Sequence, residues 1–246
     1  MSIMIVIKIG GLHMKGSLIV KNSLSKFKEN ELILASKLYK SELEGQITET
    51  AYYKTLERMC KSGELVKIAK GTYHLPKIGK YGIVPPSEKE IIETFTEKEK
   101  GTVVGYPLYN SLKLTTQVPK IITVMTSNLD AATKTIRNVM VKQVPIVYSE
   151  EIKNMIHALE VLENFYDIQD INYASFINYS KQLAETYSEK AFEDVINNIN
   201  YSKSTIAFLR EILSYYGTFN KLGNYLNTVS KYKYPKMEEL YATARI

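Results

Sequence analysis

The 246 residues, 45% of them hydrophobic, are enough for one large domain or two ordinary ones, each with its own core. The net charge of +6 is uneven, because residues 1–84 hold 14 Lys+Arg against 7 Asp+Glu while residues 85–246 hold the remaining 18 against 19. A single cysteine, Cys60, excludes an intrachain disulfide and a cysteine-cluster metal site, which fits a reducing cytoplasm. The basic first part is typical of a DNA-binding module attached to a neutral second domain, although plain solubility would also explain it.

The start of the chain is open to two interpretations. Ile3–Ile9 is apolar and β-branched, and is either a short strand or extra sequence ahead of a true start at Met14. It lacks the basic leading segment and the cleavage site of a secretion signal. No apolar run in the chain approaches the ~20 residues that cross a bilayer. We therefore expect a cytoplasmic protein that does not associate with a membrane.

Helical spacing then marks the first part of the chain. Apolar residues recur at this spacing in Ser17–Lys28 and Asn30–Leu43, which predicts two helices. A third helix is predicted after Thr48 or Thr50, either of which can cap its start. Its buried side is predicted to hold five residues, namely Tyr52, Thr55, Leu56, Met59 and Cys60.

A hairpin is predicted to follow the third helix. Gly63 stands where a helix ends with a left-handed residue. Glu64–Ile68 then offers a strand, Ala69–Gly71 a turn and Thr72–Leu75 the return strand. This order indicates a winged helix-turn-helix, in which the third helix enters the major groove of double-stranded DNA and the hairpin, the wing, holds phosphates. His74 is predicted to be a surface residue of the hairpin.

The candidate DNA-contacting residues lie on the outer side of the third helix and on the wing. A basic surface helix is often only a solvated face, and that alternative stays open at this point. The candidates on the helix are Thr50, Tyr53, Lys54, Arg58 and Lys61, and those on the wing are Lys67 and Lys70.

A second domain is predicted to begin after an extended connector, Ile83–Pro86, because proline restricts its own backbone and that of the preceding residue. The domains are then residues 1–84, the winged helix-turn-helix, and residues 85–246. Ser87 and Glu90 form a capping box for a helix that ends at Gly101. Pro107 favours a short helix, and strands are predicted at 120–126 and 135–147.

From Ser149 onward the pattern is helical. The predicted helices are centred on Ile152–Leu162, Asn172–Tyr187, Ser188–Ile199, Ile206–Tyr216, which ends at Gly217, and Phe219–Leu226. The fold class is therefore α+β and mostly helical, with a small β portion and a helical bundle in the second domain.

Catalysis is a weak alternative. Asp130 with Glu151 and Lys153 has the residue types of a metal-dependent nuclease, but such a site needs its Glu-x-Lys on a strand, whereas Glu151 begins a predicted helix. The histidines at positions 13, 74 and 157 are isolated in sequence, so a zinc site is not expected. We predict no catalytic residue, no metal and no cofactor.

Several segments together resemble the AbiEi-type antitoxin and transcriptional-regulator family of type IV toxin–antitoxin systems. They are CKSGELVKIAKGTYHLPK, the VPPS connector, GYPLYNSLKLTTQVPK and, more weakly, YYGTFNKLGNYL. The resemblance implies that the first domain binds inverted repeats in its own operator and represses its operon. It also implies that the second domain counters a cognate nucleotidyltransferase-fold toxin without forming a stable complex with it. It maps Thr50, Lys54, Arg58 and Lys61 to the DNA-reading helix.

Two other functions remain open beside this one. The first is a stand-alone winged-helix transcriptional regulator whose second domain senses a ligand or partner. The second is a nucleic-acid enzyme that uses the acidic residues of that domain. A toxin gene next to this one and rescue of growth would favour the antitoxin, and metal-dependent loss of a nucleic-acid substrate would favour the enzyme.

Overall fold

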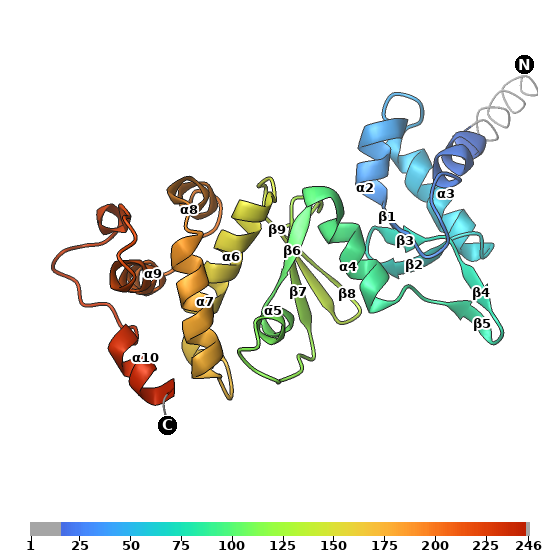
Figure 1. The fold of residues 1–246 in the computed structure, drawn as a ribbon. Coiled ribbons are helices and arrows are strands. Elements are labelled where there is room, and N and C mark those ends of the chain that lie inside the picture. Colours follow the sequence, from blue (N-terminus) through green and yellow to red (C-terminus); the bar gives the residue numbers. More distant parts are fainter. Residues whose placement is uncertain (1–15, 245–246) are drawn as a thin grey trace, which may run out of the picture. The chain divides into compact units, whose positions relative to one another are not determined.

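The computed structural model describes residues 16–244, so the alternatives for Ile3–Ile9 and Met14 lie outside the described residues. The fold is α+β, with helices predominating over three small sheets (Figure 1). The chain forms two compact units. Unit 1 reaches to Thr94 and includes the short pieces Leu129–Ala131 and Thr135–Arg137, and unit 2 holds the rest. The predicted division at residue 84 stays a prediction.

The start of unit 1 differs in part from its predicted helices. Residues 16–24 are helical, but the next segment begins with a strand, β1 (Leu32–Leu34), before α2 (Ala35–Leu38) and the π-helical turn η1 (Tyr39–Leu43). The helix predicted over Asn30–Leu43 is therefore wrong in its first part. All three residues of β1 are buried, and three consecutive residues cannot share one face of a helix.

The third helix is confirmed. α3 (Glu49–Lys61) begins at Thr48, whose side chain accepts a hydrogen bond from the backbone N–H of Ala51. Tyr52, Thr55, Leu56 and Met59 are buried, as predicted, whereas Cys60 is partly exposed. The Tyr52 hydroxyl donates to the carbonyl oxygen of Ala35 at 3.0 Å and so ties α3 to α2. Gly63 has a φ of +78°, the left-handed conformation that the sequence predicted.

The predicted hairpin is also present. β2 (Val66–Ala69) and β3 (Thr72–His74) pair in an antiparallel manner, and β1 pairs with the other side of β3, which gives the order β1-β3-β2. His74 is therefore not a surface residue. It lies in the central strand, opposite Leu32 on one side and Val66 on the other, and is only 1% exposed. The prediction considered only the β2–β3 hairpin, whereas β1 covers the other edge of β3.

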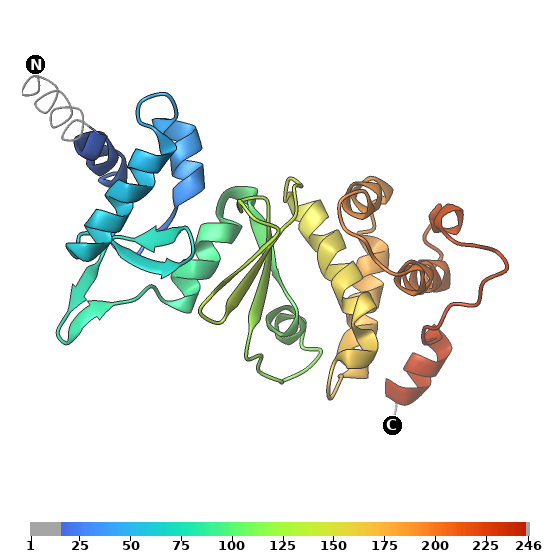
Figure 2. The same cartoon turned by 180° about the vertical axis from the view of Figure 1, so that it is seen from behind.

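A second hairpin follows the first. β4 (Lys77–Gly79) and β5 (Gly82–Val84) pair in register, and Figures 1 and 2 show this ribbon extending from the rest of unit 1. The predicted connector was thus wrong for residues 83–84, which lie in a strand. The Ser87–Glu90 capping box is confirmed, because the backbone N–H of Ser87 donates to Glu90 Oε2 at 2.7 Å and that of Glu90 to Ser87 Oγ at 3.3 Å. It begins α4 (Glu88–Thr96), which is followed by a short 3₁₀ turn, η2 (Glu97–Glu99).

Unit 2 contains most of a mixed sheet of order β6-β7-β9-β8. β6 is antiparallel to β7, and β7 is parallel to β9. The strand predicted at 120–126 is confirmed, but the run predicted at 135–147 is two strands, because Arg137 adopts a φ of +55° at the turn between them. The elements are β6 (Gly101–Val104), α5 (Tyr106–Ser111), β7 (Ile122–Thr126), β8 (Thr133–Ile136) and β9 (Val139–Gln143).

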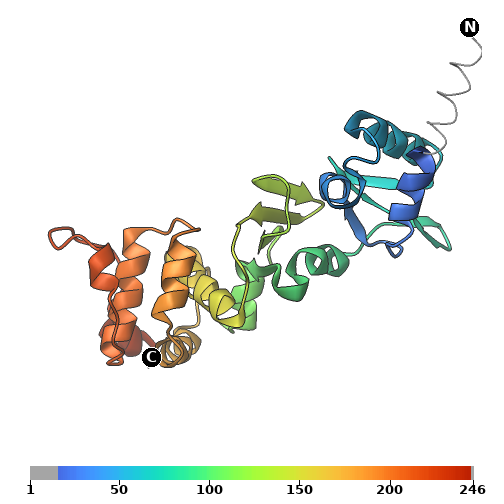
Figure 3. The ribbon, with the colours of Figure 1, turned by 90° about the horizontal axis from the view of Figure 1, so that it is seen from above.

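Helices make up the rest of unit 2, and Figure 3 shows the main ones packed alongside one another. Four of the predicted helices are confirmed, whereas the helix predicted at Phe219–Leu226 is only the 3₁₀ turn η4, which contains Gly223. The helix at the end was not predicted. The elements are α6 (Glu150–Glu163), η3 (Phe165–Asp167), α7 (Tyr173–Glu185), α8 (Glu189–Ile196), α9 (Lys203–Tyr215), η4 (Leu222–Tyr225) and α10 (Met237–Ala244).

Buried aromatic rings join these helices. The Phe165 ring lies 4.8 Å from that of Phe176 and 5.3 Å from that of Phe208, both at steep angles that favour edge-to-face contact. The three residues come from η3, α7 and α9, so this contact fixes three separate segments around one point. All three are at most 4% exposed.

One partly buried histidine is expected to make the stability of unit 2 depend on pH. His157 of α6 lies with Nε2 2.6 Å from Thr102 Oγ1, and burial lowers its pKa from 6.5 to about 4. Between these two values the unfolded chain binds a proton that the folded chain does not, so acidification destabilises the fold. We expect the wild type to lose about 2 kcal/mol through this residue between pH 7 and pH 4.5.

Urea unfolding at both pH values checks this expectation, with His157→Gln as the comparison. Glutamine keeps a partner for Thr102 but takes up no proton, so the variant should lose about 2 kcal/mol less on acidification. An identical pH dependence in the two proteins would assign the acid sensitivity to other groups.

Candidate nucleic-acid interface

One side of α3 carries a row of polar and basic side chains. Thr50, Lys54 and Arg58 follow one another at intervals of four residues, and Lys61 comes three residues later. All four are exposed, and the opposite side of the helix is held by the buried residues Tyr52, Leu56 and Met59. We call these four residues the basic face of α3. The helix is anchored along its length, so the basic face is presented on a rigid element.

Tyr53 has a different setting from the other candidates. It is partly buried, its ring centroid lies 5.2 Å from that of Tyr52, and burial raises the pKa of its hydroxyl. Its ring therefore packs against the helix that carries it, and it does not belong to the exposed row.

The cations of the basic face differ in what they contact. Arg58 donates from Nη2 to the Thr55 hydroxyl at 3.0 Å, which holds the guanidinium close to the helix. Lys61 pairs with Glu57 at 2.8 Å, an interaction that lowers the pKa of the glutamate and raises that of the lysine. Lys54 makes no ion pair within residues 16–244. Lys54 and Arg58 are thus the cations of this face that form no ion pair in the described residues, although Lys54 lies close enough to Glu57 to help lower its pKa.

The hairpin after α3 adds two more cations. Lys67 and Lys70 are exposed, and Lys70 occupies the turn with Gly71, which has a φ of +67°. Neither lysine forms an ion pair in the described part of the chain. The ion pair with Lys61 is the main cause that lowers the pKa of Glu57, and Lys54 and then Lys67 add smaller effects, so Lys67 lies close to α3. The structure therefore brings Lys67 next to the basic face, while Lys70 lies at the hairpin turn.

The β4–β5 hairpin is a further basic element that the sequence reading missed. Lys77 and Lys80 are exposed, and the turn residue Tyr81 is 94% exposed with the Lys80 ammonium 5.4 Å from its ring centroid. Ile78 is 71% exposed. A sequence signal for this hairpin was present, because Gly79 and Gly82 flank Lys80–Tyr81 and each glycine is next to an isoleucine.

Two other lysines of unit 1 are neutralised. Lys21 pairs with Glu64 and Lys26 with Glu42, each at 2.6 Å. In the described residues of this unit, cations without an ion pair lie on the basic face of α3 and on the two hairpins, and Lys28 and Lys40 are two further exposed lysines that form none. A phosphate group could bind these unpaired cations without first breaking an ion pair to a carboxylate.

The residues weighed for catalysis lie in a helical setting. Glu151 is in the first turn of α6, which Ser149 caps by accepting a hydrogen bond from the N–H of Ile152, and Lys153 pairs with Glu150 at 2.8 Å. The Glu-x-Lys sequence is thus on a helix, as predicted. Between residues 16 and 244 there is no group of three or more His, Cys, Asp or Glu side chains suited to a metal ion. In the same range, no helix has the length and apolar character to cross a membrane.

Comparison with known proteins gives one match. The model of a family of unknown function, DUF6088, matches residues 20–166, which is more than half of the chain. The match includes α3, both hairpins and the mixed sheet, and it ends at the 3₁₀ turn η3. No curated protein matches the chain.

Proposed function

The chain belongs to the DUF6088 family of unknown function, and we propose that it is a transcriptional regulator that binds double-stranded DNA through unit 1. The observation that carries the proposal is the pair Lys54 and Arg58, which form no ion pair within residues 16–244 and lie on the exposed side of an anchored helix, beside Lys67 of the next hairpin. The order of helices, strand and hairpin in unit 1 supports the winged helix-turn-helix that we propose for it. A helix fits the major groove, and cations beside it hold the flanking phosphates.

The finer part of the proposal rests on the resemblance to AbiEi-type antitoxins. In this view the protein acts in the cytoplasm, binds inverted repeats in its own operator and represses its own operon. Residues 85–246 counter a nucleotidyltransferase-fold toxin without a stable complex. No metal or cofactor is part of the proposal. In this proposal, catalysis belongs to the toxin and not to this chain.

Fluorescence anisotropy tests the DNA-binding function. The full chain is titrated into labelled duplex from immediately upstream of its own gene and into a scrambled duplex of the same composition, each at 50 and 200 mM salt. A regulator prefers the native duplex at both salt concentrations. Equal affinity for both duplexes that falls steeply with salt would indicate only nonspecific electrostatic binding to the DNA phosphates. Absence of binding to either duplex would contradict a DNA-binding function.

Growth rescue tests the antitoxin role separately. The neighbouring gene is expressed under an inducible promoter, with and without this chain under a second promoter that is not subject to its repression. Restored growth supports the antitoxin role. Toxicity that persists despite specific DNA binding favours the second candidate function, a regulator whose unit 2 senses a ligand. A polar pocket in unit 2, lined by residues of α9 and of the segment after η4, supports this alternative.

The β4–β5 hairpin is expected to contribute to DNA binding. An exposed two-stranded ribbon with two lysines and an aromatic turn suits contact with phosphates and the edge of a groove. Replacing Lys80 and Tyr81 together by alanine should weaken binding to the native duplex about three- to tenfold and reduce the salt slope by about one. Anisotropy titrations at several salt concentrations measure both effects.

Lys89→Ala is the matched control for this variant. Lys89 is an exposed lysine of the same unit that faces Glu93 at 3.6 Å across one turn of α4. Its replacement should change the affinity less than twofold. An equal loss in both variants would indicate a general effect of net charge, and no loss in the hairpin variant would remove this ribbon from the interface.

A further inference from the structure

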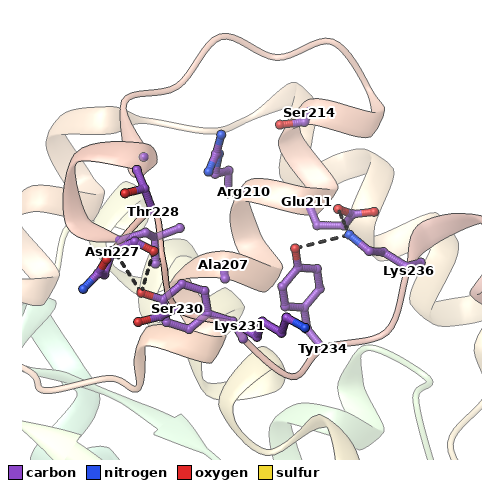
Figure 4. A pocket seen from close by; sticks show the side chains of 13 residues that line it. Ala207, Arg210, Glu211, Ser214, Asn227, Thr228, Ser230, Lys231, Tyr234 and Lys236 are labelled. Atoms are coloured by element: carbon purple, nitrogen blue, oxygen red, sulfur yellow. Dashed lines mark hydrogen bonds and ion pairs between the residues drawn. The ribbon is translucent and has the colours of Figure 1, made fainter.

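A polar pocket lies in unit 2, between α9 and the irregular segment that follows η4 (Figure 4). Its volume is about 610 Å³, within the usual size range of small-molecule sites. Side chains from α9 form one wall and those of the segment after Leu226 the other. The residues that matter here are Arg210, Glu211, Ser214, Thr228, Ser230 and Lys231.

The pocket has a net positive charge. Glu211 is the carboxylate among the lining residues, and Lys236 neutralises it with an Nζ–Oε2 distance of 3.0 Å. Lys236 is further held by the Tyr234 hydroxyl at 3.3 Å. Arg210 and Lys231 have no ion pair among the residues that the structure describes. Two cations in the lining are therefore available to a ligand.

Backbone hydrogen bonds shape the wall opposite α9. The Tyr232 hydroxyl accepts from the N–H of Asn227 at 2.7 Å, and the N–H of Val229 donates to Asn227 Oδ1 at 3.0 Å. The N–H of Ser230 donates to the Asn227 carbonyl at 3.3 Å. The segment is thus closed on itself, although it has no regular secondary structure. This closure holds Thr228 and Ser230 around the same opening as Arg210 (Figure 4).

Gly223 leaves room for the arginine. A Cβ at this position would lie 3.9 Å from Cζ of Arg210, so a longer side chain would contact the guanidinium. With glycine there, the planar group stays accessible from the pocket. Arg210 itself is exposed, and its removal should not disturb the buried side of α9.

We propose that this pocket binds a small molecule that carries phosphate groups. A guanidinium binds phosphate oxygens through two parallel hydrogen bonds, and the ammonium of Lys231 supplies a second positive charge. The hydroxyls of Ser214, Thr228 and Ser230 can donate further hydrogen bonds. An apolar ligand would instead remove these groups from water without replacing their hydrogen bonds, which costs free energy. The site goes beyond DNA binding by unit 1 and does not depend on it.

Isothermal titration calorimetry on the full chain tests the proposal, with ATP, AMP, inorganic phosphate and adenosine as probes at 50 mM salt. Affinity should rise with the number of phosphates, from no measurable heat with adenosine to the tightest binding with ATP. Arg210→Gln should weaken ATP binding at least tenfold, and Lys231→Gln several-fold. Lys203→Gln removes an exposed charge from the same helix outside the pocket and should leave the affinity within twofold.

Three binding results, and one from hydrogen exchange, would overturn the assignment. The first is no binding of ATP at millimolar concentration. The second is an equal loss in Lys203→Gln and Arg210→Gln, because the effect would then be one of general charge. The third is tighter binding of a ten-nucleotide single strand than of ATP, with that affinity lost in Arg210→Gln, which would make the pocket a nucleic-acid site. Hydrogen exchange should also slow in residues 223–236 when ATP is bound, and unchanged exchange there would contradict the location.

Discussion

Replacing Arg58 by alanine is expected to weaken binding to the native upstream duplex by about 1–3 kcal/mol, and Lys54→Ala should act in the same direction. Both side chains lie on the exposed side of α3, and neither forms an ion pair within the described residues. If they contact base edges, the loss will be large for the native duplex and small for the scrambled one. If they contact only phosphates, both duplexes will lose affinity alike. Anisotropy titration of the two duplexes separates these cases.

Two further variants make this test specific. Lys26→Ala removes the same charge from unit 1, but at a residue that pairs with Glu42 at 2.6 Å, so it should have little effect. Glu57→Ala removes the carboxylate that engages Lys61 and should strengthen binding modestly, because it deletes a negative charge beside the interface. Unchanged affinity in both Lys54→Ala and Arg58→Ala would exclude α3 as the helix that reads DNA.

Replacing Gly101 by alanine is expected to destabilise unit 2 by about 3 kcal/mol. A Cβ at this position would lie 2.3 Å from the carbonyl oxygen of Met125 and 2.4 Å from that of Phe95. Both atoms belong to the backbone, so they cannot turn away as a flexible side chain would. Gly101 is buried and pairs with Thr126 across the β6–β7 register, and any shift would disturb the sheet.

Urea unfolding measures this effect, and Gly223→Ala is the control. That substitution adds the same methyl group to unit 2, but the group would meet only Cζ of Arg210 at 3.9 Å, an ordinary contact. The control should change the free energy of unfolding by less than about 0.5 kcal/mol. A loss of less than 1 kcal/mol in Gly101→Ala would mean that the backbone at the start of β6 accommodates a side chain.

Helices with strong caps and clear periodicity followed from the sequence. Thr48 caps α3, Ser149 caps α6 and the Ser87–Glu90 box begins α4, and each of these hydrogen bonds joins residues at most three positions apart. The exposed row of α3 was predictable for the same reason, because a period of 3.6 residues decides which side chains share a face. Local interactions of this kind are encoded within a few residues and need no distant partner.

Strands depended on partners far away in the chain. Leu32–Leu34 has the composition of a helix, but it pairs with residues 72–74, about forty positions later. The same pairing buries His74, which was predicted to be a surface residue of the hairpin. Gly101 was predicted to end a helix, whereas it is the first residue of β6, where neighbouring backbone atoms leave no room for a side chain. Short strands carry weak local signals, and their pairing decides their conformation.

Residue types and their order along the chain therefore determined the charge asymmetry, the capped helices and the candidates on α3. Tertiary structure decided which of those candidates are available. It paired Lys61 with Glu57, packed Tyr53 against its own helix and brought Lys67 beside α3. It also formed the pocket between α9 and a segment without periodicity. The physical reason is that periodicity fixes the direction of a side chain within its element, whereas ion pairs, burial and cavities depend on which elements pack together.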